Sequence, residues 1–275
     1  MELKSSKGKV ILAGAGPGDA ELLTLKAYRY LQSAEVVLTD RLVSEVIITQ
    51  YVNPKAEILF VGKQCGRGAS TPQTTINDLL VHYALQGKLV VRLKGGDVSF
   101  FSNVLDELKT LIQHGISYEI IPGVTAAAGA SAYAGIPLTA RGYATSVRFL
   151  TCYKSDVVSE TYWKELAATD DTLVFYMSAE TACHVVSKLI ENGVDAAKKI
   201  AVVEQASTPL QNIYTADLNE FNKQFERHRF RSPSLLIIGK VVQLHETFQW
   251  VPNHETITEF FAPVAVTGAV NDRRA

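Results

Sequence analysis

Hydrophobic residues in the first half of the chain form short, β-branched runs that alternate with longer segments of helical spacing. Such alternation is typical of parallel strands joined by crossover helices. It predicts strands at Val10–Ala15, Glu35–Thr39, Glu57–Val61, Lys88–Leu93 and Ser117–Ile121. It predicts helices at Ala20–Gln32, Thr74–Gln86, Val104–His114 and, rich in small residues, Val124–Ala134. We therefore expect an α/β fold whose parallel sheet is covered on both faces.

The alternation restarts after Gly135–Gly142, a stretch that contains proline and glycine and has weak periodicity. Further strands are predicted at Val147–Thr151, Thr172–Met177, Ile200–Glu204, Asn212–Thr215 and Leu235–Ile238, and helices at Glu160–Ala168, Ala179–Asn192 and Leu218–Arg227. We expect two α/β domains, residues 8–136 and 143–245, joined near 137–143 with a ligand cleft between them. Residues 246–275 are predicted to be a tail, because 253–275 show no clear period.

Composition and charge exclude several classes of protein. The 275 residues are 47% hydrophobic and 20% charged, which is enough for a core without disulfides, and the net charge of −1 offers no general attraction to nucleic acid or a membrane surface. The three cysteines lie far apart, without a CxxC pair, so we expect neither a zinc site nor a disulfide framework. The apolar run that follows Met1–Lys9 is too short for a signal peptide or membrane span, so we expect a cytoplasmic protein.

The first motif is Gly14-Ala-Gly-Pro-Gly-Asp19, between a predicted strand and a helix. It resembles a dinucleotide-binding loop, but Asp19 stands where that fingerprint requires glycine. Pro17 also removes a backbone donor that a phosphate would need. The motif therefore favours a ligand without phosphates, and a plain glycine-rich turn is the alternative.

Acidic residues follow two other strands. Asp40-Arg41 follows the second strand, where an acid can bind a ribose, act as a base or cap a helix. Arg92-Leu-Lys-Gly-Gly-Asp97 ends the fourth strand. Its glycines allow a close approach to the backbone, and Asp97 can accept hydrogen bonds from a ligand or cap a helix. Each motif alone is weakly specific.

Three more segments complete the pattern: Pro122-Gly-Val-Thr-Ala126, Tyr176-Met177 and Val203-Glu-Gln-Ala206. With GAGPGD at 14–19, RLKGGD at 92–97 and AGIPLT at 134–139, they resemble the tetrapyrrole (corrin/porphyrin) methylases in order and spacing, along residues 8 to about 245. Within that family the segments match the branch that methylates uroporphyrinogen III twice to give precorrin-2, which leads to sirohaem and cobalamin.

The resemblance implies two α/β domains that hold S-adenosyl-L-methionine between them, S-adenosyl-L-homocysteine as product, no metal, a tetrapyrrole substrate and usually a homodimer. It places Asp40 and Lys63 at the positions of the proton acceptor and donor. Arg41 and Arg141 are the predicted partners of the substrate carboxylates. The implied donor-binding residues are Pro17, Gly95, Gly96, Asp97, Phe100, Thr125, Ala126, Met177 and Ala206.

The chain departs from the family pattern after Asp97. Asn103 stands in place of an arginine to which a catalytic role has been given, and Val104 and Leu105 replace two loop glycines, which favours a regular helix start. We expect Lys63, Arg67 or Lys154 to replace the missing guanidinium. Three alternatives stay open: methylation of another precorrin, a non-catalytic protein that binds tetrapyrrole or donor, and a nicotinamide-dependent dehydrogenase, against which the failed fingerprint argues.

Overall fold

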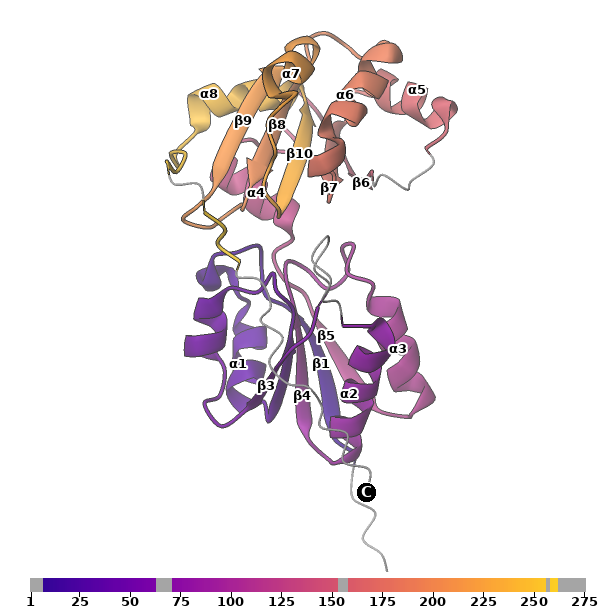
Figure 1. Ribbon diagram of the computed structural model, residues 1–275, viewed down its shortest axis with the longest axis vertical. Helices are drawn as coiled ribbons and strands as arrows, with labels where there is room; N and C mark the ends of the chain where they lie inside the picture. Colours follow the sequence, from indigo (N-terminus) through magenta and orange to yellow (C-terminus); the bar gives the residue numbers. More distant parts are fainter. Residues whose placement is uncertain (1–6, 63–70, 153–157, 256–257, 262–275) are drawn as a thin grey trace, which may run out of the picture. The chain divides into compact units, whose positions relative to one another are not determined.

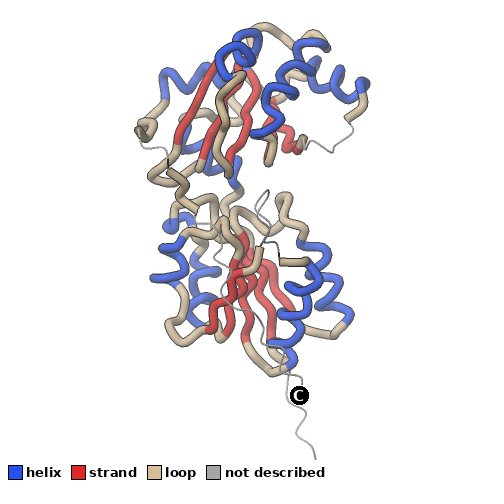
Figure 2. Tube along the Cα trace, in the orientation of Figure 1, coloured by secondary structure: helices blue, strands red, loops and turns tan. Residues whose placement is uncertain are grey.

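The computed structural model describes residues 7–62, 71–152, 158–255 and 258–261, and it divides into two compact units. Among these residues, the first unit contains 7–124 with Phe261, and the second contains 125–260. Each unit has one five-stranded sheet with helices on its faces, as Figures 1 and 2 show. The predicted α/β class is confirmed.

The sheet of the first unit is entirely parallel, as predicted, with strand order β3-β2-β4-β1-β5. Its strands are β1 (Lys9–Gly14), β2 (Val36–Thr39), β3 (Glu57–Phe60), β4 (Leu89–Lys94) and β5 (Ser117–Ile121). Its helices are η1 (Ala20–Leu22), α1 (Leu25–Ser33), η2 (Ile47–Tyr51), α2 (Gln73–Leu85) and α3 (Val104–Gln113).

Helices cover both faces of this sheet because its strands are apolar on both sides. One core joins α1 and η2 to residues such as Ile11 and Val91, and the other joins α2 and α3 to residues such as Leu12 and Val90. The predicted helix 20–32 is divided in two, since Asp19 caps a short η1 and Thr24 caps α1. All five strands run the same way, so their carboxyl ends share one edge.

The second unit has a mixed sheet of order β6-β7-β10-β8-β9, in which only β6 and β7 are parallel. Its strands are β6 (Val147–Thr151), β7 (Thr172–Tyr176), β8 (Lys199–Glu204), β9 (Asn212–Asp217) and β10 (Ser234–Gly239). Its helices are α4 (Ala126–Ala134), α5 (Glu160–Ala168), η3 (Ala179–Thr181), α6 (Ala182–Glu191), α7 (Leu218–Phe225), η4 (Lys240–Leu244) and α8 (His245–Phe248).

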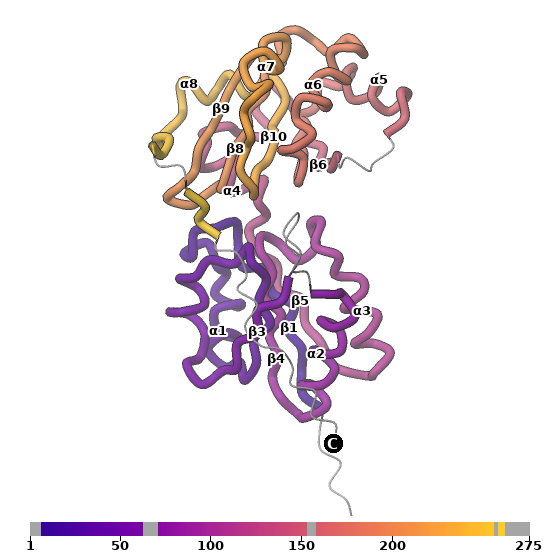
Figure 3. Tube along the Cα trace, in the orientation of Figure 1, coloured from indigo at the N-terminus to yellow at the C-terminus, as the bar shows by residue number. Residues whose placement is uncertain are grey.

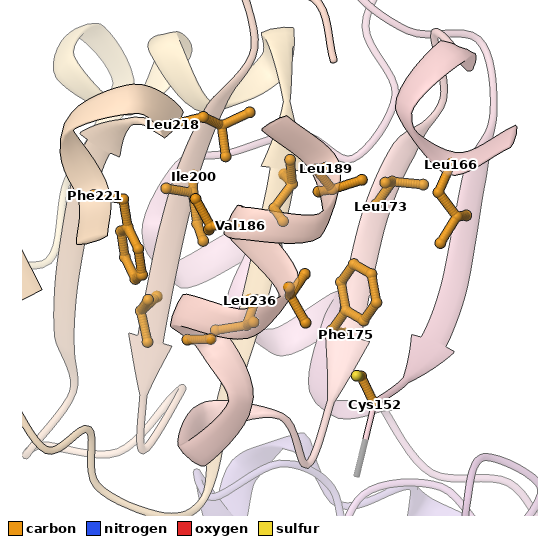
Figure 4. Packing of buried hydrophobic residues seen from close by; sticks show 14 of the residues in the cluster. Cys152, Leu166, Leu173, Phe175, Val186, Leu189, Ile200, Leu218, Phe221 and Leu236 are labelled. Atoms are coloured by element: carbon orange, nitrogen blue, oxygen red, sulfur yellow. The ribbon is translucent and has the colours of Figure 1, made fainter. Parts of the chain in front are cut away.

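Two cores lie on the faces of this second sheet. Helices α5, α6 and α7 cover one face, where Phe175, Val186, Phe221 and Leu236 pack together (Figure 4). Helix α4 and η4 lie against the other face. The small side chains of α4 let it pack closely on this sheet, which explains why the units divide at residue 124. The predicted linker at 137–143 therefore lies inside the second unit.

The described residues from Gln249 to Phe260 belong to the second unit and make hydrogen bonds to it. The amide of Asn253 pairs with both backbone groups of Ile213 in β9, accepting from its N at 2.8 Å and donating to its O at 2.9 Å. The amide of Gln205 accepts from Phe260 N (2.6 Å) and donates to Thr258 O (3.1 Å). In Figure 3 the coloured segment that follows α8 accordingly lies beside the orange strand β9.

Candidate functional site

The glycine-rich motifs of the first unit meet at the carboxyl edge of its sheet, where their backbones are in direct contact. Gly16 and Gly96 exchange backbone hydrogen bonds of 3.1 and 2.7 Å. A Cβ atom on Gly14 would lie 2.6 Å from Gly96 O, and one on Gly123 would lie 2.3 Å from the same oxygen. These glycines are therefore required for loop-to-loop packing, whereas the sequence suggested only close approach by a ligand. The neighbouring Pro17 is buried.

Asp97 connects two of these loops through both of its carboxylate oxygens. Oδ1 accepts from Ser99 N at 2.7 Å, and Oδ2 accepts from Gly123 N at 2.8 Å. The side chain is buried, and the residue that caps α3 is Asn103 instead. Asp97 thus fixes the Gly95–Asp97 turn against the loop that follows β5, and the helix-cap interpretation of Asp97 is excluded.

Asp40 makes a similar connection between β2 and β4. Its carboxylate accepts from Leu42 N at 3.1 Å and from Gly95 N at 3.3 Å through either oxygen. No helix begins directly after it, so it is not a helix cap. Asp40 thus lies beside the Gly95 turn, and the half-buried Arg41 follows it, with its backbone N close to Gly62. Lys63, the predicted proton donor, lies outside the described residues.

In the second unit, the hydroxyl of Tyr176 organises the start of α4. It shares a 2.7 Å hydrogen bond with Thr125 Oγ1 and accepts from Ala127 N at 3.1 Å. The predicted donor residues Thr125 and Ala126 are thereby connected to the end of β7, where Met177 follows with its side chain 45% exposed. The sequence does not indicate this role of Tyr176, because a hydrogen bond between residues 51 positions apart leaves no local pattern.

Backbone strain in the described residues is concentrated in these loops. The non-glycine residues with positive φ are Phe101, Asn103, Met177, Gln205 and Ser207. They follow β4, β7 and β8, and they flank or include the predicted donor residues Phe100, Met177 and Ala206. Left-handed backbone costs a non-glycine residue about 1–3 kcal/mol and is concentrated at functional sites. This observation therefore supports the loops chosen from the sequence.

The predicted site residues form one group in each unit. Pro17, Asp40, Gly95, Gly96 and Asp97 lie together at the edge of the first sheet, with Phe100 exposed in the next turn. In the second unit Ala126 and Ala206 belong to the same core cluster as Tyr176. Arg141 is exposed and is connected to neither group by a described contact.

Two further positions bear on the recognition of substrate carboxylates. The guanidinium of Arg148 in β6 binds carboxylates within the protein, Asp171 at 2.5 Å and Glu165 at 2.6 Å. Asn103 donates to Asp106 Oδ2 at 3.0 Å, and α3 begins at Val104, which confirms the predicted helix start. The suggested substitutes for the missing guanidinium, Lys63, Arg67 and Lys154, lie outside the described residues.

Within the part of the chain that the structure describes, no helix has the length and apolar character needed to cross a membrane.

Comparisons with known proteins show the family to which the chain belongs. The family model for tetrapyrrole (corrin/porphyrin) methylases matches residues 9–222. A sirohaem synthase of Ruthia magnifica subsp. Calyptogena magnifica is 43% identical over 247 residues, which are 90% of this chain and 52% of the relative. The chain thus spans about half the length of the curated relatives it matches.

Solved structures are also similar to this chain. The uroporphyrin-III C-methyltransferase of Thermus thermophilus, complexed with S-adenosylhomocysteine, is 36% identical with a TM-score of 0.72, over 86% of this chain and 100% of that one. A cobalt precorrin-4 methyltransferase is 26% identical with a TM-score of 0.75, over 85% and 95%. On the family match and these relatives, the chain belongs to the tetrapyrrole (corrin/porphyrin) methylase family.

Proposed function

We propose that the protein transfers two methyl groups from S-adenosyl-L-methionine to carbon atoms of uroporphyrinogen III, giving precorrin-2. The observation that supports this most is the packed set of loops at Gly14–Pro17, Asp40 and Gly95–Asp97, in a chain similar over the whole solved chain of the Thermus thermophilus enzyme complexed with S-adenosylhomocysteine. The family further suggests that the protein is a cytoplasmic homodimer.

The loops fit a sulfonium nucleoside better than a dinucleotide. Pro17 offers no N–H group, and the N–H groups of Gly16, Gly96 and Gly123 are already bonded within the protein. A phosphate would need such donors, whereas a nucleoside without phosphates needs mainly a pocket of matching shape and a few hydrogen-bond acceptors. We assign Gly95, Gly96, Asp97, Phe100 and Pro17 to the donor site in the first unit. The second unit would contribute Thr125, Ala126, Met177 and Ala206.

The reaction places modest demands on the protein. A nucleophilic carbon of the macrocycle forms a bond to the methyl group as the bond from methyl to sulfur breaks, and S-adenosylhomocysteine leaves with the electron pair. The alkylated carbon framework then loses a proton to a base. Asp40 is our candidate for that base, because its oxygens retain lone pairs beyond the two amides that they accept. The remaining rate enhancement would come from positioning of the two reactants and from exclusion of water.

An anaerobic incubation of the purified protein with uroporphyrinogen III and S-adenosyl-L-methionine, followed by mass spectrometry of the tetrapyrrole, tests the proposal. Two added methyl groups are expected. Donor binding is measured separately, by calorimetry with S-adenosylhomocysteine. Binding without methylation would refute the substrate assignment alone and would favour a different precorrin, which the similarity to the cobalt precorrin-4 enzyme and the presence of Asn103 also suggest.

Arg141→Ala tests substrate recognition within the same assay. Loss of one guanidinium that pairs with a substrate carboxylate should raise KM for the tetrapyrrole by roughly 10-fold or more and leave affinity for S-adenosylhomocysteine within about 2-fold. Arg229→Ala is the matched control, since it removes an equally exposed arginine from the same unit. Equal loss of donor affinity in Arg141→Ala, or no rise in KM, would contradict the assignment.

A further inference from the structure

A buried carboxylate in the first unit binds two cations from one strand. Glu107 in the first turn of α3 accepts from Arg92 Nε at 3.1 Å and from Lys94 Nζ at 2.8 Å. The Glu107 side chain is 0% exposed, and both cations are 5% exposed. Burying three charges costs several kcal/mol per ion before their attraction is counted, so such a cluster is an inefficient source of stability alone. Its position in the fold suggests another role.

The pair of Lys94 and Glu107 joins the two ends of the loop that carries predicted donor residues. Lys94 is the last residue of β4, directly before Gly95. Glu107 lies just beyond the N-cap of α3, Asn103. The intervening segment contains Gly95, Gly96, Asp97 and Phe100. An ion pair across the base of this loop restricts the conformations that the loop can adopt.

Arg92 extends the same cluster to the neighbouring strand. Its Nη1 donates to Leu38 O in β2 at 3.3 Å and to Leu93 O in β4 at 3.0 Å. Leu38 lies two residues before Asp40, whose carboxylate accepts from Gly95 N. The guanidinium therefore connects β2 and β4 where both strands end. Glu107 fixes the direction of that guanidinium through Nε.

We propose that Glu107 is a positioning residue for the methyl-donor site, and that it acts through Lys94 and Arg92 on the Gly95–Asn103 loop and on the strand end that carries Asp40. The proposal depends on the proposed donor site but not on the identity of the tetrapyrrole. It predicts that removal of the carboxylate weakens donor binding in protein that remains folded.

The electrostatics of the cluster also predicts weaker donor binding when the Glu107 carboxylate is removed. Burial lowers the pKa of Lys94, and the attraction of Glu107 opposes that change. Without the carboxylate, Lys94 and Arg92 would repel one another in a buried position, with Asp40 as the remaining nearby anion. The base of the loop should then open, and a displacement of about 1 Å can reduce catalysis by up to roughly 100-fold.

The test compares Glu107→Gln with wild type by calorimetric titration with S-adenosylhomocysteine, well below the unfolding midpoint of each protein. We expect affinity to fall roughly 10- to 100-fold. In the methylation assay KM for S-adenosyl-L-methionine should rise more than kcat falls. Lys94→Met is the second variant, because it breaks the loop-closing pair but leaves a neutral Arg92–Glu107 pair in the core, so it should fold if Glu107→Gln does not.

Glu119→Gln is the matched control. Glu119 in β5 also binds two lysines, Lys9 at 2.8 Å and Lys26, within the same unit, but it has no described contact with the donor loops. The Glu119→Gln variant should retain donor affinity within about 2-fold, because loss of a partly exposed ion pair away from the donor loops has little effect.

The outcomes separate the two proposals. If folded Glu107→Gln or Lys94→Met binds the donor product within 2-fold of wild type, the positioning role is refuted, even if the unfolding midpoint falls. If wild type binds S-adenosylhomocysteine but does not methylate uroporphyrinogen III, only the substrate assignment fails and the comparison of variants still applies. Wild-type protein without affinity for S-adenosylhomocysteine would refute both proposals.

Discussion

Replacing Asp97 by asparagine exchanges one carboxylate oxygen for an NH2 group at the junction of two loops. In the wild type both oxygens accept from backbone amides, those of Ser99 and Gly123. Asparagine retains one acceptor, so one of these N–H groups must face another donor. The side chain is buried, and water cannot easily replace the lost acceptor.

The expected cost follows from these contacts. A hydrogen bond to a charged group contributes about 1.5–3 kcal/mol, and the unpaired donor adds to the loss, so we expect the free energy of unfolding to fall by about 2–4 kcal/mol. For a domain of this size each kcal/mol lowers the midpoint by roughly 2–8 °C. Scanning calorimetry should therefore show a decrease of at least about 4 °C for the transition of the first unit.

Donor affinity provides the second readout, because Asp97 fixes the Gly95–Asp97 turn. Titration with S-adenosylhomocysteine should show a loss of about 10-fold or more. Asp195→Asn is the control: Asp195 accepts from one backbone amide, Ala197 N at 2.9 Å, which asparagine can keep, and it pairs with Lys240 at 2.9 Å in a partly exposed ion pair that contributes little to stability. An Asp97→Asn protein with an unchanged midpoint and unchanged donor affinity would refute the assignment of both oxygens to the backbone.

Two further predictions concern the second unit. Tyr176→Phe removes the acceptor for Ala127 N, so it should lower the free energy of unfolding by about 1–3 kcal/mol and weaken donor binding; unchanged calorimetry and titration would count against it. The hydroxyl of Ser146 and then Arg148 lower the pKa of Asp171 to about 2. Because this folded-state pKa is depressed, Asp171 stabilises fully above its ordinary value of about 4 and loses this effect as the pH falls toward 2. The difference in midpoint between wild type and Asp171→Asn should thus shrink below about pH 4, and a constant difference from pH 7 to pH 3 would contradict the reasoning.

The strands of the first sheet could be predicted from the sequence, because burial on both faces requires continuous runs of apolar, often β-branched residues that are easy to identify. The runs that became β1 and β4 were predicted to within a residue or two, and so were the glycine and aspartate turns that follow them. In the second unit the strands were also found, but their directions were not. Strand β10 lies between β7 and β8 and is antiparallel to both. An apolar run has the same pattern in either direction, so the direction and order of these strands are known only from their long-range pairing.

The candidate site was likewise predicted only in part from the sequence. Motifs identified which residues belong to the site, and the structure changed what several of them do. The carboxylate of Asp97 contacts Gly123, 26 residues away, and Tyr176 contacts Thr125 across 51 residues. The triad of Arg92, Lys94 and Glu107 lies within one short segment, but its charges look like ordinary surface residues until burial is known. These contacts depend on which strands are neighbours, and no local spacing encodes them.

The pairing of Asn253 with Ile213 affects how copies of the protein meet one another. Strand β9 is at the margin of its sheet, and such a strand normally offers its free backbone groups to any extended chain that approaches. A side-chain amide presents an N–H donor and a carbonyl acceptor side by side, much as a peptide group does, so Asn253 fills both positions at Ile213. The segment after α8 thus closes this position of the edge to pairing with the edge of another copy.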